Sequence, residues 1–186
     1  MTKDTKKLLA ESLLTLLCSK PIDHITIKDI VTECDVTRQT FYNHFSDIYE
    51  LVEWISKRAA DRALVSSSDY DSWQQGFYNI MVDLKQHETI VHNIYESRYR
   101  DVLEDYFYRV VFKYVAKVVE LQAEGMNVED KYKHFIAHFY TLAFIALIFE
   151  WAHKGMKEDP QTLIDQTSVL VEGDFKKALQ KYDNQD

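Results

Sequence analysis

The sequence has 186 residues, 46% of them hydrophobic, which suffices for one large helical unit or a small module joined to a larger one. Four glycines and two prolines are too few for a sheet protein with many tight turns, so an all-α fold is expected. The formal net charge of −8 argues against a protein that coats nucleic acid without specificity.

The charge is unevenly distributed along the chain. Residues 1–65 contain nine Lys or Arg and ten Asp or Glu, whereas the remainder contains 13 and 20. Only the N-terminal part could therefore approach a polyanion without strong repulsion. The two cysteines, Cys18 and Cys34, form neither a disulfide framework nor a zinc-binding pair, and both are expected to be small core residues.

The chain begins with an expected amphipathic helix. Apolar residues recur at helical spacing over 5–19, and the helix should end before Pro21. This pattern differs from that of a signal peptide, so we expect a cytoplasmic protein. Thr26 followed by Asp29 resembles a capping box, which predicts a second helix from there to about Cys34.

A third, short helix is predicted from Thr37, its expected N-cap by residue type, through His44. A longer helix is expected at 47–65, and the Ser-rich residues 66–69 indicate a linker. The predicted organisation is a helix-turn-helix domain at 1–46, a connecting helix at 47–65 and an effector-sensing and dimerisation domain at 66–186.

Further helices are expected after the linker, near 70–86, 88–96, 98–122, 128–154 and 160–182, with breaks at Gly125 and Gly155. The longest apolar run, 139–149, is too short to span a membrane. It predicts a buried core helix, and no membrane partner is expected.

The two short helices over 26–45 have the pattern of a helix-turn-helix. Their apolar positions are spaced so that both can close on the first helix: Ile27, Ile30, Val31, Val36, Phe41 and Phe45. This leaves Thr37 to Thr40 pointing outward at the start of the third helix. A recognition helix needs this geometry, because its N-terminal residues reach base edges in the major groove.

The side chains of this segment suit DNA. Arg38 can bind guanine and Gln39 adenine, each through two hydrogen bonds, while Thr40 offers a hydroxyl and a methyl group. Other side chains suit contacts with the DNA phosphates, and such contacts fix the register of the protein on the duplex. The predicted DNA-binding residues are Thr26, Lys28, Thr37, Arg38, Gln39, Thr40, Tyr42, Asn43 and His44.

Three segments carry a family resemblance. They are the stretch Ile27-Lys28-Asp29-Ile30, the run Val-Thr-Arg-Gln-Thr-Phe-Tyr-Asn-His-Phe-Ser over 36–46, and Leu51. Together they resemble the N-terminal domain of TetR/AcrR-type regulators. The resemblance covers about residues 5–60, and beyond them only the architecture agrees. It implies a three-helix DNA-binding head, a ligand-responsive C-terminal core, and a homodimer formed by the last two helices. Double-stranded operator DNA is the implied partner.

Within that family, the amino-acid sequence of this run and of Leu51 to Ile55 is similar to that of regulators of dihydroxyacetone-kinase genes. Some of those regulators activate transcription. The chain departs from the family pattern at two positions. Asp35 stands where the turn usually has Gly, although Asp tolerates left-handed backbone better than most residues. Ile48 replaces a Lys that would contact phosphate; Lys3, Lys6 and Lys7 could compensate.

Histidines in the C-terminal part raise a metal hypothesis. His134 and His138 lie four residues apart and share a helix face, as do Glu150 and His153 about three turns later. His87 and His92 flank a predicted helix start and could supply a third ligand. A pair at this spacing suits Zn(II) when another ligand arrives from elsewhere. The alternative is that these are polar or interface histidines.

Aromatic-rich stretches over 95–114 and 135–151 could line a pocket for an organic effector or pack as ordinary core. The acidic C-terminal part disfavours an anionic ligand. Two other functions compete with a DNA-binding regulator. An enzyme on a helical bundle is disfavoured because the chain has a single Glu-x-x-His pair and no Gly-rich phosphate loop. A helical protein-interaction adaptor or co-activator that binds no effector stays open.

Overall fold

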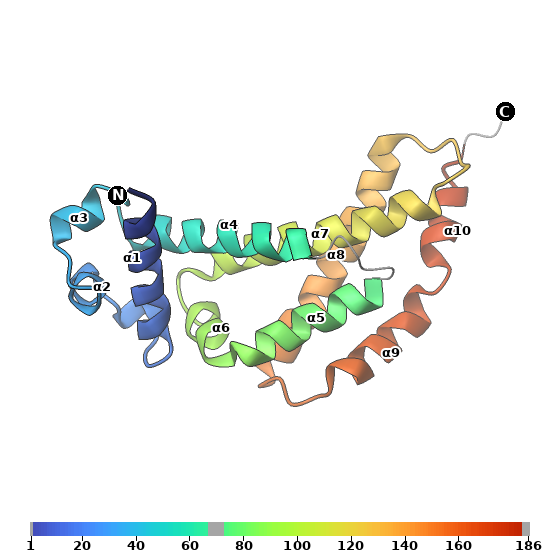
Figure 1. The fold of residues 1–186 in the computed structure, drawn as a ribbon. Helices are drawn as coiled ribbons and strands as arrows, with labels where there is room; N and C mark the ends of the chain where they lie inside the picture. Colours follow the sequence, from blue (N-terminus) through green and yellow to red (C-terminus); the bar gives the residue numbers. More distant parts are fainter. Residues whose placement is uncertain (1, 67–72, 184–186) are drawn as a thin grey trace. The chain divides into compact units, whose positions relative to one another are not determined.

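The computed structural model describes residues 2–66 and 73–183, and every regular element in these ranges is helical, which confirms the all-α prediction. Packing divides the chain into two compact units. The first contains residues 1–62 and 87–106, and the second contains 63–86 and 107–186 (Figure 1). Each unit is therefore assembled from two separate segments of the chain. The predicted functional division, with boundaries at residues 46 and 65, stays a prediction.

The first unit contains the predicted helix-turn-helix. Its elements are α1 (Thr2–Leu17), the 3-10 helix η1 (Ile22–His24), α2 (Ile27–Glu33), α3 (Arg38–Tyr42), most of α4 (Ile48–Ser66), α6 (Glu88–Tyr95) and the start of α7 (Arg100–Gln122). Helix α1 packs against α2 and α6, and α2 packs against α3. The apolar stripe of α1 meets Ile30, Phe41, Phe45 and Leu51 in one core.

The turn between α2 and α3 depends on Asp35, whose φ of +52° lies in the left-handed region. The N–H of Val36 donates to the carbonyl oxygen of Val31 at 2.9 Å, which closes the end of α2. Asp at this position costs some backbone strain relative to Gly but keeps the turn. The expectation for this departure from the family pattern is therefore confirmed.

The first unit also contains residues that the sequence placed in the effector domain. Tyr99 and Val102 are buried in the helix-turn-helix core, and Ile90 and Ile94 of α6 pack against it. The amide of Asn93 donates to the carbonyl oxygen of Leu17, at the end of α1, at 2.8 Å. Helix α6 and the first turns of α7 are thus structural parts of the head.

The second unit contains α5 (Trp73–Gln86), the rest of α7, α8 (Asp130–His153), α9 (Pro160–Val171) and α10 (Asp174–Gln180) (Figure 1). Helix α5 packs against α9, and α10 packs against α8 and α9. The prediction of a single last helix at 160–182 is wrong. Gly173 has a φ of +76°, a left-handed backbone conformation that glycine adopts at little cost. This residue separates α9 from α10.

Helix α8 has 24 residues and is long and apolar enough to cross a membrane, by length and composition alone. The apolar part of α8 is therefore longer than the run 139–149 from which the sequence prediction was made. One face is buried in the second unit and includes Ile136, Phe144 and Ile148, as expected of a core helix. The opposite face leaves Phe135, Phe139 and Leu142 exposed.

Candidate nucleic-acid interface

Helix α3 is anchored by one buried side chain and exposes most of the others. Phe41 is fully buried in the core of the first unit. The positions predicted to face outward are exposed at Thr37, Arg38 and Gln39 and half-buried at Thr40. The remaining predicted residues of this segment also reach the surface: Tyr42 and Asn43 are exposed, and His44 is half-buried. The structure brings seven predicted residues together on this segment.

Hydrogen bonds within the segment hold α3 in place. The hydroxyl of Thr37 accepts from the N–H of Thr40 at 3.1 Å, so Thr37 is the predicted N-cap. The two threonine hydroxyls are 2.9 Å apart. The amide nitrogen of Gln39 donates to the amide oxygen of Asn43 at 3.1 Å, which fixes both side chains one turn apart. The helix ends at Tyr42 and not at His44 as predicted.

The start of α2 has the predicted capping box. Thr26 donates both its N–H and its hydroxyl to Oδ2 of Asp29, at 2.8 and 2.9 Å, and the N–H of Asp29 donates to Oγ1 of Thr26 at 3.2 Å. Lys20 lies 3.2 Å from the same carboxylate oxygen. The hydroxyl of Thr26 therefore serves the cap, and its contact with phosphate stays a prediction. Lys28, in the first turn of α2, is exposed.

These contacts shift the titration of Asp29. The hydrogen bonds from the backbone and hydroxyl of Thr26, followed by the one from Lys20, lower the pKa of the Asp29 carboxyl. A hydrogen bond to the charged form of a carboxyl favours that form. The carboxylate also lies near the N-terminal end of the helix dipole, which stabilises negative charge.

Helix α4 begins with a third side-chain cap, shortly after α3 in the chain. The N–H of Glu50 donates to Oδ1 of Asp47 at 2.9 Å, so Asp47 is the N-cap of α4. Ser46 donates its N–H and hydroxyl to Glu50 at 2.7 and 2.8 Å. Ile48 is buried, and the ammonium of Lys6 lies 5.0 Å from the centre of the Phe45 ring.

Sequence reasoning missed the contacts that brace α4 from behind. The hydroxyl of Tyr49 donates to Oδ2 of Asp101 at 2.8 Å, and its ring stacks on Tyr99 with centroids 6.0 Å apart. Arg98 lies 3.3 Å from Asp23 and over the Tyr99 ring. No local pattern could reveal the contacts of Tyr49 with Asp101 and Tyr99 or the ion pair of Arg98 with Asp23, because these partners are about 50 or more residues apart in sequence.

The predicted zinc ligands do not gather. Among the side chains that the structure describes, no group of three or more His, Cys, Asp or Glu could hold a metal ion. His134 packs on the Phe112 ring, and Nδ1 of His138 is 2.9 Å from the hydroxyl oxygen of Tyr108. Glu150 pairs with Lys154 at 2.7 Å.

The remaining predicted ligands, among the described residues, also belong to no such group. His87 and His92 belong to the first unit, whereas His153 lies in the last turn of α8 in the second. The zinc hypothesis therefore has no support. The expectation that Cys18 is a core residue is also wrong: its side chain is exposed, whereas Cys34 is half-buried.

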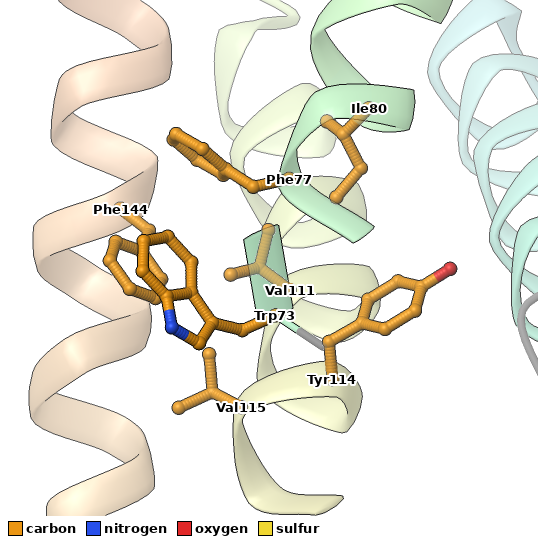
Figure 2. Close-up of a pocket in the computed structure, with 7 residues that line it drawn as sticks. All are labelled: Trp73, Phe77, Ile80, Val111, Tyr114, Val115 and Phe144. Atoms are coloured by element: carbon orange, nitrogen blue, oxygen red, sulfur yellow. The ribbon is translucent and has the colours of Figure 1, made fainter. Parts of the chain in front are cut away.

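A pocket in the second unit tests the organic-ligand hypothesis (Figure 2). Its lining is Trp73, Phe77, Ile80, Val111, Tyr114, Val115 and Phe144. Of its aromatic residues, only Tyr114 and Phe144 come from the two predicted aromatic-rich stretches. The others in those stretches have different places: Tyr99 lies in the head core, Phe107 packs edge-on against Phe149, and Phe139 is exposed.

Two short capped helices, one of them presenting polar side chains outward, define a helix-turn-helix DNA-binding protein. The profile described as "Bacterial regulatory proteins, tetR family" matches residues 13–55, and "Transcriptional regulator C-terminal region" matches 71–173. This chain belongs to the TetR family of transcriptional regulators, which are DNA-binding proteins and not enzymes.

Individual relatives agree with this assignment. The chain is 25% identical over 154 residues, 81% of each protein, to the HTH-type dhaKLM operon transcriptional activator DhaS of Lactococcus lactis subsp. lactis (strain IL1403). A solved structure of a dihydroxyacetone kinase operon activator DhaS has a TM-score of 0.69 and 23% identity, covering 97% of this chain and 98% of that one. The resemblance to dihydroxyacetone-kinase regulators is thus confirmed as a similarity.

A structure of a putative TetR-family transcriptional regulator from Syntrophomonas wolfei str. Goettingen has a TM-score of 0.67 at 17% identity, covering 94% of this chain and 96% of that one. At this identity the likeness shows the fold alone. It extends over the head and the C-terminal helices together, so the whole chain has the architecture of the family.

The lowered pKa of Asp29 predicts a specific pH dependence of stability. A carboxyl whose pKa falls on folding stabilises the native state above its unfolded pKa of about 3.9, and this contribution disappears as the pH falls through the folded value. We expect Asp29→Asn to lower the urea midpoint at pH 7, and the gap from the wild type to close below about pH 4.

Circular dichroism during urea unfolding at pH 7, 5 and 3 measures this gap. Glu33→Gln, at an exposed acid on the same helix, is the control and should leave the midpoint nearly unchanged at each pH. A gap for Asp29→Asn that is equally large at pH 7 and pH 3 would contradict the assignment.

Proposed function

We propose that this TetR-family regulator reads operator DNA through Thr37 to His44, works as a homodimer, and changes its DNA affinity when an effector binds its second unit. The observation that carries the proposal is the capped, outward-facing α3, held from behind by the buried Phe41. Because its target is bacterial DNA, we place the protein in the cytoplasm.

Two kinds of contact are proposed for the recognition segment. Arg38 and Gln39 read base edges, because both are exposed at the first turn of α3 and can form paired hydrogen bonds with guanine and adenine. Lys28, Tyr42 and His44 bind phosphate, with Thr26 supporting the start of α2. Thr37, Thr40 and Asn43 hold or extend this surface through the hydrogen bonds inside the segment.

Control by an effector is supported by the course of α7. Its first turns belong to the DNA-binding unit, where Asp101 accepts the hydrogen bond from Tyr49, and the same helix continues into the second unit. A change in α7 within the second unit would alter a helix that is part of the head core. An effector with different affinities for two states of this helix would shift DNA affinity.

Arg38→Ala should raise the dissociation constant for specific DNA about 5- to 150-fold, which corresponds to the roughly 1–3 kcal/mol of a base contact through two hydrogen bonds. Lys28→Ala should weaken binding to all sequences alike and reduce the salt slope by about one. Mobility-shift titrations of the chain's own upstream DNA at several salt concentrations measure both effects.

Lys85→Ala, at an exposed lysine of α5, is the control for the loss of positive charge. Arg38→Ala protein that still binds the specific site as tightly as the Lys85→Ala protein would contradict the proposed role of α3. That outcome would favour a helical adaptor that works through protein partners.

The proposed dimer face lies on α8. Phe135, Phe139 and Leu142 are spaced by four and three residues, so they share one face of the helix, and they are 59%, 57% and 50% exposed. Single exposed apolar residues are ordinary, but an aligned row indicates an interaction site. Val169 and Leu170 on α9 are even more exposed. The occupant we propose is a second copy, because members of the family act as dimers.

Phe139→Asp should raise the dimer dissociation constant at least about tenfold, because a charge would be buried without a partner. Sedimentation velocity over a dilution series measures this constant. Leu121→Asp is the matched control, since Leu121 is 52% exposed in the same unit but on α7. If both variants remain equally dimeric, the face on α8 is not the interface.

A narrower proposal concerns the direction of control. The sequence and structural comparisons both return an activator of a dihydroxyacetone kinase operon, with coverage of 81% and 97% of this chain. We therefore propose that this chain activates transcription of dihydroxyacetone kinase genes in the genome that encodes it. This choice distinguishes it from the repressors of the same family.

A reporter carrying the DNA upstream of those kinase genes should be transcribed more strongly when the chain is expressed, and the increase should be lost with Arg38→Ala. Lower transcription would indicate repression. Binding to the chain's own upstream DNA without binding to the kinase promoter would contradict the narrower proposal alone.

A further inference from the structure

Two amide side chains on the surface of the recognition segment are joined by their own hydrogen bond. Nε2 of Gln39 donates to Oδ1 of Asn43 at 3.1 Å. The backbone joins the same residues, since the N–H of Asn43 donates to the carbonyl oxygen of Gln39 at 3.0 Å. Asn43 follows α3 in helical backbone, with a φ of −69° and a ψ of −13°. The direction of the Gln39 amide is therefore coupled to a residue one helical turn later.

Gln39 occupies the place in α3 from which a side chain meets a base. It is the second residue of the helix, and the N-terminal residues of a recognition helix contact base edges. It is exposed, and it precedes the buried Phe41 by two residues, so it lies on the side opposite to the core. Asn43 is exposed just beyond the other end of the helix. Asn43 can thus act on the Gln39 amide without touching the base that Gln39 contacts.

The direction of an amide determines which adenine it can bind. Adenine presents an acceptor, N7, beside a donor, the N6 amino group, so a glutamine forms both hydrogen bonds only when its nitrogen faces N7 and its oxygen faces N6. In the reversed base pair these two groups follow each other in the opposite order across the major groove. A half-turn of the last torsion of glutamine exchanges its nitrogen and oxygen. A free glutamine can therefore serve both orders, whereas an oriented one serves a single order.

The hydrogen bond to Asn43 removes this freedom from Gln39. A half-turn of the Gln39 amide alone would bring its Oε1 against Oδ1 of Asn43, and two acceptors have no hydrogen to share. In the observed direction one hydrogen of Nε2 bonds to Asn43, and the second stays available together with Oε1. The pair therefore presents one donor and one acceptor in a fixed order, which is the pattern that adenine requires.

The same pair of residues occurs once more among the described helices. Nε2 of Gln75 donates to Oδ1 of Asn79 on α5, also at 3.1 Å. Amide pairs at this spacing stabilise helices in general, and the pair on α5 can have this role alone. It belongs to the second unit and lies outside the recognition segment, so it provides a matched control for an effect on base preference.

We propose that Asn43 is a positioning residue that directs the Gln39 amide toward adenine on one particular strand of the operator. The proposal rests on the proposed function, because it assigns the base that the same segment reads. A base contact through two hydrogen bonds discriminates about 5- to 150-fold against a wrong base pair. Asn43 converts this discrimination into a preference for one strand.

The test uses the full chain and its own upstream DNA, in which each base pair of the bound site is replaced in turn. Mobility-shift titrations give the affinities. The position that Gln39 reads is the one at which Gln39→Ala changes the ranking of the four base pairs. There the wild type should prefer adenine on one strand over adenine on the other at least fivefold, and Asn43→Ala should reduce this ratio at least threefold.

This ratio compares two DNA molecules on one protein sample, so partial unfolding of a variant does not change it. Asn43→Asp can only accept a hydrogen bond, so Nε2 of Gln39 must still face residue 43. We expect this variant to keep the wild-type ratio within twofold, although its added negative charge weakens binding to every sequence. Asn79→Ala, the matched control, should change neither the ratio nor the affinity.

A double variant separates positioning from direct contact. In the Gln39→Ala background, Asn43→Ala should leave the base preference unchanged, because there is no amide to direct. A further change of the ratio in that background would overturn the proposal. An unchanged ratio in the single variant Asn43→Ala would also overturn it, as would an Asn43→Asp ratio as low as that of Asn43→Ala.

Failure of this inference is distinguishable from failure of the proposed function. If Arg38→Ala weakens specific binding but Asn43→Ala leaves the strand preference intact, the positioning role fails and the recognition segment stands. If Arg38→Ala and Gln39→Ala both retain specific binding, the recognition segment itself is wrong, and the role of Asn43 fails with it.

Discussion

Burial of Phe41 is the constraint on which the DNA-binding surface depends. Its ring is fully buried and contacts Phe45, whose ring meets Trp54 of α4, so one aromatic series joins α3 to α4. Burial of such a ring contributes about 1.5–3 kcal/mol, far more than any single exposed contact in the segment. Because Phe41 points inward, the helical period directs Gln39, two residues earlier, to the opposite side. Arg38 and Tyr42 are exposed as well. Two capped helices and an aspartate in left-handed backbone then hold this orientation.

Local features of the head were predictable, because their partners lie three or four residues apart. The capping box at Thr26, the cap at Thr37 and the left-handed Asp35 all follow from residue type and spacing. The bracing of Tyr49 by Asp101 was not predictable, since its partners are 52 residues apart. The membership of α6 in the head was missed for the same reason. The break at Gly173 carried a usable signal, a glycine within a helical pattern, that was applied only to Gly125 and Gly155.

The metal hypothesis found no support, and the aromatic residues took different places, because both depend on side-chain direction, which spacing alone does not determine. His134 and His138 share a face as predicted, but one packs on Phe112 and the other meets Tyr108, so neither is directed at a common metal. Aromatic residues that looked equivalent in sequence divide among core, surface and pocket. The same helix, α7, carries residues of the head core and of the pocket, and this continuity is the physical basis for regulation in our account.

The central claim is that two copies of α3 enter the major groove of one duplex. Methylation interference at guanine N7 on the chain's upstream DNA tests it most directly, because this atom lies in the major groove. The account predicts interference in two segments whose centres are one helical turn, ~34 Å, or a multiple of it apart. Interference confined to a single segment, or protection of the minor groove alone, would contradict it.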